Sequence, residues 1–138
     1  MLNSPFSSKK EENKDVIIPS DIKIVFVADL FAEDYVGGAE LTTDALIKSA
    51  RLPVFKVHAK DVSMATLESG HKAYWIFGNF SGMNVDLIPT IVANMNYSIL
   101  EYDYKFCKYR SVEKHELAEQ KPCDCHDQMQ GKMVSALF

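Results

Sequence analysis

The sequence predicts an α/β fold, a Rossmann-like parallel sheet with helices on both faces. Short runs rich in β-branched residues alternate with stretches whose apolar residues recur at helical spacing. The first run, residues 22–28 (IKIVFVA), is almost continuously apolar, as in a strand covered on both faces. Strands that alternate with helices in this way form βαβ units, in which the strands are parallel.

The expected elements follow one another as βαβαβαβ, with a further helical pattern near the end of the chain. We expect strands at residues 22–28, 54–59, 73–77 and 96–102, and helices at residues 39–50, 61–67, 86–95 and 127–138. Pro53 ends the first helix, Asp61 caps the second and Gly70 terminates it. Pro89 falls in the first turn of the third helix, where proline is tolerated. The expected strand order in the sheet is 3-2-1-4.

Composition limits the classes of function. Apolar residues make up 47% and charged residues 25% of the 138 residues, as in an ordinary globular protein. The net charge of -4 disfavours nucleic acid and anionic membranes as partners. No apolar run reaches the roughly 20 residues of a transmembrane helix, and residues 1–15 lack the apolar core of a signal peptide. The expected compartment is cytoplasmic, and no cofactor is expected.

Both ends of the chain depart from the alternating pattern. Residues 1–16 are expected to form a disordered arm, because they are mostly polar. Residues 104–124 are basic and aromatic at first and then polar, without a clear period. The last helical pattern ends on Phe138, with neither a capping glycine nor a polar tail. We therefore expect residues 17–138 to form one domain that is truncated at its C-terminus.

The most informative motif is Gly37-Gly38-Ala39-Glu40, just before the first expected helix. Adjacent glycines leave backbone N–H groups open at the positive end of the helix dipole, where a phosphate can approach closely. The carboxyl edge of the first strand is also where open α/β sheets bind ligands. A flexible turn with glycine as helix cap explains the same residues equally well. The G-x-G-x-x-G and G-x-x-x-x-G-K-[ST] motifs are absent, which disfavours the usual NAD and ATP sites.

The segments IKIVFVADLF and YVGGAELTTDALIKSA resemble the N-terminal domain of family 4 retaining glycosyltransferases, and EYDYKFCKYRS is similar to phage-type members. The layout agrees over about residues 22–102. The resemblance implies half of a two-domain GT-B fold, in a hexosyltransferase that moves a sugar from a nucleotide-sugar donor to an acceptor. It places Gly37, Gly38 and Ala39 against the donor diphosphate. The family's second domain, with its E-x-x-x-x-x-x-E motif, is missing from this sequence, so the chain alone should bind weakly and catalyse nothing.

The resemblance also implies an acceptor site beside the fourth expected strand. Asp103 and Tyr104 follow that strand, and Asp29 ends the first strand at the same edge of the sheet. Lys105 and Arg110 are basic groups that could meet a phosphate or an acidic acceptor. A solvated loop with ordinary charge pairing is the alternative for these residues. No catalytic residue is assigned.

Cysteine and histidine gather near the end of the chain, at Cys107, His115, Cys123, Cys125 and His126. These side chains could supply zinc ligands, but adjacent Cys125 and His126 rarely reach one ion, and the usual C-x₂₋₄-C pairs are absent. A loop with reduced thiols is therefore favoured and no metal is predicted, with zinc on these five residues as the alternative. A further hypothesis is a nucleophile, Cys107 or Cys123, paired with His115 or His126.

A non-enzymatic function competes with the glycosyltransferase. A free-standing α/β module would bind a small ligand or a partner protein in the same crevice, with the Cys/His loop as a structural clip. Among the other chemistry-bearing residues, His58 is expected to be a packed or edge histidine. Trp75 and Tyr74 are expected in the core rather than on a sugar-stacking surface.

Overall fold

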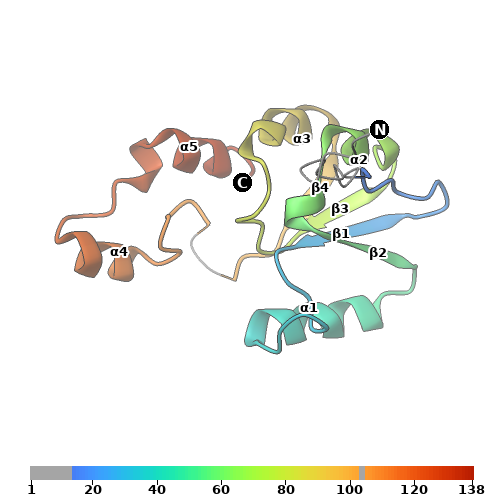
Figure 1. Ribbon diagram of the computed structural model, residues 1–138, viewed down its shortest axis with the longest axis horizontal. Helices are drawn as coiled ribbons and strands as arrows, with labels where there is room; N and C mark the ends of the chain where they lie inside the picture. The colour runs from blue at the N-terminus through green and yellow to red at the C-terminus, as the bar shows by residue number, and fades with distance from the viewer. Residues whose placement is uncertain (1–13, 103–104) are drawn as a thin grey trace, which may run out of the picture.

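The computed structural model describes residues 14–102 and 105–138 (Figure 1). These residues form one four-stranded parallel sheet with strands β1 (Ile24–Ala28), β2 (Val54–His58), β3 (Tyr74–Phe77) and β4 (Asn96–Ile99). The helices are α1 (Gly38–Ser49), α2 (Met64–Ser69), α3 (Ile88–Asn94), α4 (Val112–Glu119) and α5 (Met129–Ser135). Short 3-10 turns are η1 (Ala59–Asp61), η2 (Val85–Leu87) and η3 (Cys125–Asp127). The predicted Rossmann-like α/β fold is confirmed.

The strands lie in the order β2-β1-β3-β4, so the expected order 3-2-1-4 is wrong. β1 is central and pairs with both β2 and β3, with Ile24 opposite Val54 on one side and Tyr74 on the other. β2 is an edge strand, and its middle residue Lys56 is exposed. Lysine is a residue that edge strands carry to avoid further pairing. The lysine at position 56 therefore indicated an edge strand, whereas the expected order had placed this strand between two others.

The strand order explains which helix covers which face, because βαβ connections are right-handed. The chain moves from β1 to β2 in one direction, and then from β2 across to β3 and β4 in the other. Accordingly α1 covers one face of the sheet, whereas α2 and α3 cover the opposite face (Figure 1). The connections leaving β1 and β3 thus diverge, which opens a crevice between the carboxyl ends of these two neighbouring strands.

Side chains alternate along β1 between two hydrophobic cores. Val25 and Val27 belong to the larger core, on the side of α2 and α3. Phe26 and Ala28 belong to a smaller core on the side of α1, together with Phe31. This alternation follows from the two-residue period of a strand. The almost continuous apolar sequence of β1 is therefore explained by burial on both faces.

Trp75 is the largest side chain of the core and is fully buried. Its indole Nε1–H donates to the carbonyl of Gly70 at 2.9 Å, and its ring stacks on Phe77. A Cβ on Gly70 would meet the Trp75 ring at 2.7 Å, so glycine is required where α2 ends. The expectation of a core tryptophan is confirmed. Tyr74, by contrast, is 43% exposed and bonds to Ser98, so placing it in the core was wrong.

Helix α2 begins later than expected. Ser63 Oγ accepts the Thr66 N–H at 3.2 Å, and Thr66 Oγ1 accepts the Ser63 N–H at 3.1 Å, which together form a capping box. Asp61, the expected cap, lies in η1 instead. Ser63 is the better cap because its pairing with Thr66 satisfies two backbone N–H groups at the start of the helix, one on each residue.

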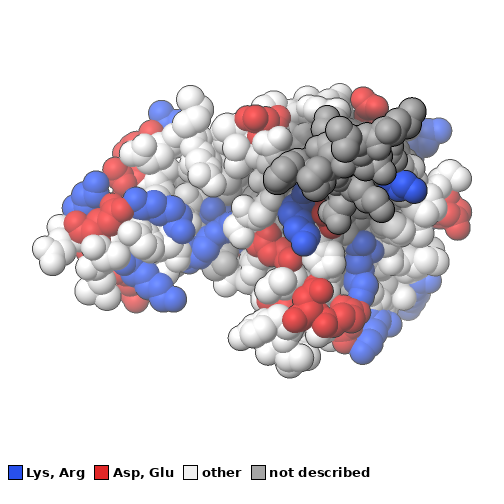
Figure 2. Space-filling model, in the orientation of Figure 1, with Lys and Arg blue, Asp and Glu red and all other residues white. Residues whose placement is uncertain are grey.

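Residues 105–138 form a lobe beside the α/β unit (Figure 1). Helix α4 was not expected from the sequence pattern, and the side chain of Ser111 caps it by accepting the Lys114 N–H at 3.3 Å. Helix α5 agrees with the helical pattern at the end of the chain, and Val134 and Leu137 join the larger core. Figure 2 shows acidic and basic side chains on the lobe and a hollow between it and α1.

Some of the predicted features fall on residues that the structure does not describe. Residues 1–13 of the expected arm lie outside them, as do the predicted acceptor-side residues Asp103 and Tyr104. Val16, in the described part of that arm, packs against the larger core. Within residues 14–102 and 105–138, no helix has the length and apolar character needed to cross a membrane.

Candidate functional site

A cavity of about 140 Å³ lies in the crevice between the ends of β1 and β3. The Asp29 N–H donates to the Asn79 carbonyl at 2.7 Å, which ties the two strand ends together beneath it. Helix α1 closes another side of the cavity. The polar lining comes from Asp29, Glu40, Thr43, Asn79 and Tyr102. This is the position at which open α/β sheets bind their ligands.

The carboxylate of Asp29 holds the loop that follows β3. It accepts the Ser81 N–H at 2.9 Å, the Ser81 hydroxyl at 2.5 Å and the Gly82 N–H at 2.8 Å. Charge-assisted bonds of this kind are stronger than neutral ones. Asp29 therefore shapes the crevice through these bonds, in addition to lining the cavity.

Of the Gly37-Gly38-Ala39 segment, Ala39 lines the same cavity. Gly37 and Gly38 precede it at the N-terminus of α1. Gly37 is the N-cap of α1, in an extended conformation, and has no side chain with which to cap the first turn. A Cβ on Gly38 would meet nothing within 4 Å, so there is open space beside the helix N-terminus. The side chain of Glu40 folds back toward Gly37, where an added Cβ would lie 2.5 Å from Glu40 Oε2. An anion could therefore approach the backbone N–H group of Gly38, whereas the Glu40 carboxylate lies beside Gly37.

Two side chains that follow β4 also reach the crevice. Tyr102 OH lies 2.9 Å from Thr43 Oγ1 of α1. Lys105 is only 3% exposed; its Nζ donates to Asn79 Oδ1 at 3.3 Å and lies 5.7 Å from the centre of the Tyr102 ring. Of the predicted acceptor-side residues, Asp29 lines the cavity itself, and Lys105 reaches its edge through Asn79. Lys105 and Arg110 both line a second cavity of about 220 Å³, between the loop after β3 and α5.

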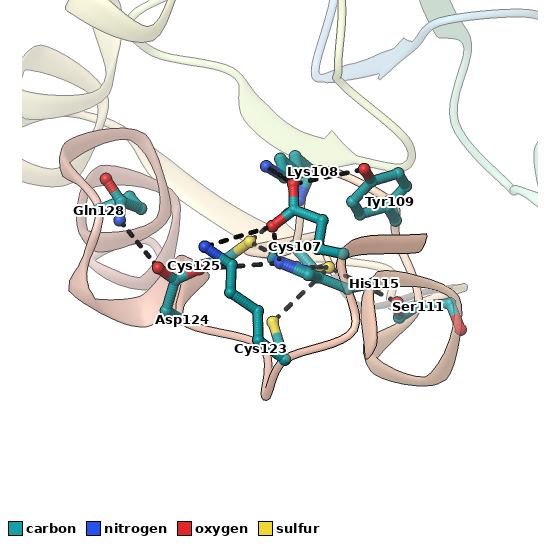
Figure 3. A network of polar contacts seen from close by, with 11 residues as sticks. Cys107, Lys108, Tyr109, Ser111, His115, Cys123, Asp124, Cys125 and Gln128 are labelled. Atoms are coloured by element: carbon teal, nitrogen blue, oxygen red, sulfur yellow. Dashed lines mark hydrogen bonds and ion pairs between the residues drawn. The ribbon is translucent and has the colours of Figure 1, made fainter. Parts of the chain in front are cut away.

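Four of the five Cys/His residues converge in the lobe (Figure 3). One ligand atom from each of Cys107, His115, Cys123 and Cys125 lies within 4.8 Å of all the others. We call these four residues the Cys/His cluster. His126 is not a member, because its ring stacks on Phe106 and its Nδ1 lies 3.3 Å from Ser135 Oγ.

Three segments supply the cluster, namely the turn before α4, α4 itself and the loop before η3. The chain reverses twice between them, at Arg110 and at Gln120, whose φ angles are 58° and 54°. Left-handed backbone at residues other than glycine is uncommon and is not evident from residue type. The sequence identified these four residues among five candidates, but their spacing favoured a loop with reduced thiols over a shared site. What it missed was α4, the helix that carries His115 between the thiols of the two flanking segments.

The geometry of the Cys/His cluster shifts the pKa values of its members. Burial acts to raise the pKa of Cys107, but hydrogen bonds from His115, the Tyr109 amide and the other thiols outweigh it and lower that pKa to about 7. Burial raises the pKa of Cys125 to about 11. Hydrogen bonds to Cys107 and Glu119 raise the pKa of His115. These four side chains could hold a metal ion, since thiolate and imidazole are the ligands that zinc prefers.

Glu119 supports the cluster from outside. Its Oε2 lies 2.9 Å from His115 Nε2, and its carboxylate also pairs with Lys108. The ammonium group of Lys108 and the hydrogen bond to His115 lower the pKa of Glu119 to about 2 despite some burial. Glu119 is therefore ionised at neutral pH and orients the His115 ring so that Nδ1 faces the sulfur atoms.

His58 lies at the sheet edge, as expected, with its Nε2 2.6 Å from Asp34 Oδ2. The Phe31 N–H, and then the His58 ring, lower the pKa of Asp34. A carboxyl group with a depressed pKa in the folded state adds stability above its unfolded pKa of about 3.9 and loses it as the pH falls through the folded pKa. We therefore expect Asp34→Asn to lower the melting temperature at pH 6, by an amount that shrinks as the pH falls below the unfolded pKa of the carboxyl group. A constant difference across this range, measured by circular dichroism, would contradict the assignment.

Comparisons of this chain with protein-family models, curated proteins and solved structures found no match.

Proposed function

We propose that this chain is the N-terminal, acceptor-side domain of a glycosyltransferase of the GT-B kind, which transfers a sugar from a nucleotide-sugar donor to an acceptor. The observation that carries the proposal is the cavity at the carboxyl ends of β1 and β3, bordered by the N-terminus of α1. The resemblance of the first strand and helix to family 4 enzymes, and of the EYDYKFCKYRS segment to phage-type members, supports the same function. A second domain would complete the donor site, so this chain alone binds weakly and does not catalyse transfer.

The chemistry of the cavity suits a sugar and a diphosphate. At Gly38 the backbone is open, and the N–H groups of the first turn of α1 would stabilise charge developing on the leaving diphosphate. The carboxylate of Glu40 would accept hydrogen bonds from sugar hydroxyls, and the hydroxyl groups of Thr43 and Tyr102 would either accept or donate them. Negative charge at Glu40 disfavours a phosphate beside Gly37, which leaves Gly38 and Ala39 as the diphosphate contact.

Titration of the ¹⁵N-labelled chain with UDP or GDP tests the proposal, and we expect shifts at the Gly38 and Ala39 amides. Gly38→Asp should weaken this binding at least about tenfold by charge repulsion. The fold should tolerate the change, because the side chain enters open space and an aspartate favours a helix N-terminus. Ser49→Asp, with the same charge change at the other end of α1, is the matched control and should bind as the unmodified chain does. The absence of any shift at millimolar ligand would count against the proposal.

A second candidate is a free-standing α/β module that binds a small ligand or a partner protein. The convergence of the Cys/His cluster favours it, because such a cluster can act as a structural clip. The same titration separates the two functions. If no amide shifts on addition of UDP or GDP, the result would support the binding module.

A further inference from the structure

We propose that Cys107, His115, Cys123 and Cys125 form a structural zinc site. The proposal is independent of the glycosyltransferase function, because it concerns the lobe rather than the crevice. It rests on the distances among the four side chains, on their burial and on the contacts that surround them.

The distances agree with a tetrahedral ion. Zn–S bonds of about 2.3 Å and Zn–N bonds of about 2.0 Å imply S···S separations of about 3.8 Å and S···N separations of about 3.5 Å. The Cys107 and Cys123 sulfur atoms lie 3.8 Å apart. His115 Nδ1 lies 3.6 Å from the sulfur of Cys107 and 3.3 Å from that of Cys125. One ion at the centre would therefore contact all four ligands with little movement of the chain.

The site is closed. His115, Cys107 and Cys125 are 0%, 1% and 4% exposed, and Cys123 is half-buried. Four protein ligands fill a tetrahedral shell, whereas catalytic zinc sites keep one position for water or substrate. Three thiolates with one imidazole are also a common structural combination and favour zinc over harder cations. The ion would therefore have a structural role.

The surroundings support metal binding by the ligand atoms named. Nδ1 of His115 can bind an ion only if Nε2 carries the proton, and Glu119 accepts from Nε2 at 2.9 Å. A carboxylate behind a ligating histidine is the usual outer partner of zinc. The Lys108 N–H donates to the Cys125 sulfur at 3.5 Å, which stabilises a thiolate. These contacts hold the site in a binding-competent geometry.

A neighbouring group, His115, Glu119 and Asp124, is a weaker candidate for the ion. Its carboxylates already have partners, since Glu119 pairs with Lys108 and Asp124 accepts from Gln128 at 3.2 Å. This group would also use His115 through Nε2, leaving the three thiols without an ion. The Cys/His cluster therefore accounts for more of the observed contacts.

The test is metal analysis of the chain purified under reducing conditions, with cobalt substitution as an independent readout. We expect one zinc per chain. The metal-free chain with Co²⁺ should show sulfur-to-cobalt charge-transfer bands and the intense visible bands of tetrahedral cobalt. Cys107→Ser and Cys125→Ser should lower zinc affinity at least about a hundredfold, and Glu119→Gln about 10- to 100-fold.

His126→Ala is the matched control, because His126 is adjacent to Cys125 but lies outside the cluster. It should retain one zinc and the unchanged cobalt spectrum. The cobalt spectrum of the unmodified chain keeps the proposal testable even if the cysteine variants fail to fold. Absence of both zinc and the cobalt spectrum under reducing conditions would overturn the proposal, as would full zinc binding by the cysteine variants.

Discussion

Replacing Trp75 by alanine is expected to lower the free energy of unfolding by about 3–5 kcal/mol, the usual cost of deleting a buried large aromatic side chain. Trp75 has no exposed surface, stacks on Phe77 and donates its indole N–H to the Gly70 carbonyl. Alanine would leave a cavity in the larger core and remove one of the two hydrogen bonds that the Gly70 carbonyl accepts, the other being the bond from the Ala73 N–H. Because a domain of this size is stable by only about 5–15 kcal/mol, this loss is a substantial part of its total stability. Urea denaturation measures the change.

Two further variants separate the causes of this loss. Trp75→Phe fills part of the cavity but cannot donate to Gly70, so it should cost less than alanine, about 1–3 kcal/mol. Tyr74→Ala is the matched control, because Tyr74 is the preceding residue of β3 but points its ring to the surface. It should cost no more than about 1 kcal/mol. Equal losses for Trp75→Ala and Tyr74→Ala would contradict this description of the core.

Removing the proposed zinc ion is expected to unfold α4 and to leave the sheet folded. Only His115 of α4 is buried, and Leu117 is 81% exposed, so this eight-residue helix has almost no apolar contact to hold it. Isolated helices of this length are unstable in water. With a chelator, the amide hydrogens of α4 should therefore exchange at least about a hundredfold faster. Hydrogen exchange followed by NMR measures the effect helix by helix.

The central strand β1 provides the internal reference for this experiment. The amide hydrogens of β1 are protected by the whole core, so their exchange rate should change only if the stability of the whole domain changes. The effect on α5 should be smaller than on α4, because Val134 anchors it to the larger core. Retention of α4 protection after complete removal of zinc would show that the lobe is held by other contacts. An equal loss in β1 would instead mean that the ion stabilises the entire domain.

Apart from α4, the order of strands and helices could be predicted from the sequence because it depends on local properties. An apolar run such as β1 needs burial on both faces, Pro53 cannot continue α1, and Gly70 is required beside Trp75. The position of the Gly37-Gly38 pair at the start of a helix follows in the same way. Strand order was predicted wrongly because it depends on which neighbour each strand pairs with. Only the exposed Lys56 in β2 marked that strand as an edge.

Tertiary structure alone decided which chemistry-bearing side chains meet. Neighbours in the sequence separate, as when His126 turns to Phe106 while Cys125 joins the cluster. Distant residues converge, since left-handed backbone at Arg110 and Gln120 folds two loops onto His115. The spacing of these ligands along the chain does not show that they meet, because a helix and two left-handed residues intervene between them. The sequence was therefore sufficient to name five candidate residues, and the reversals of the chain determined which four of them lie together.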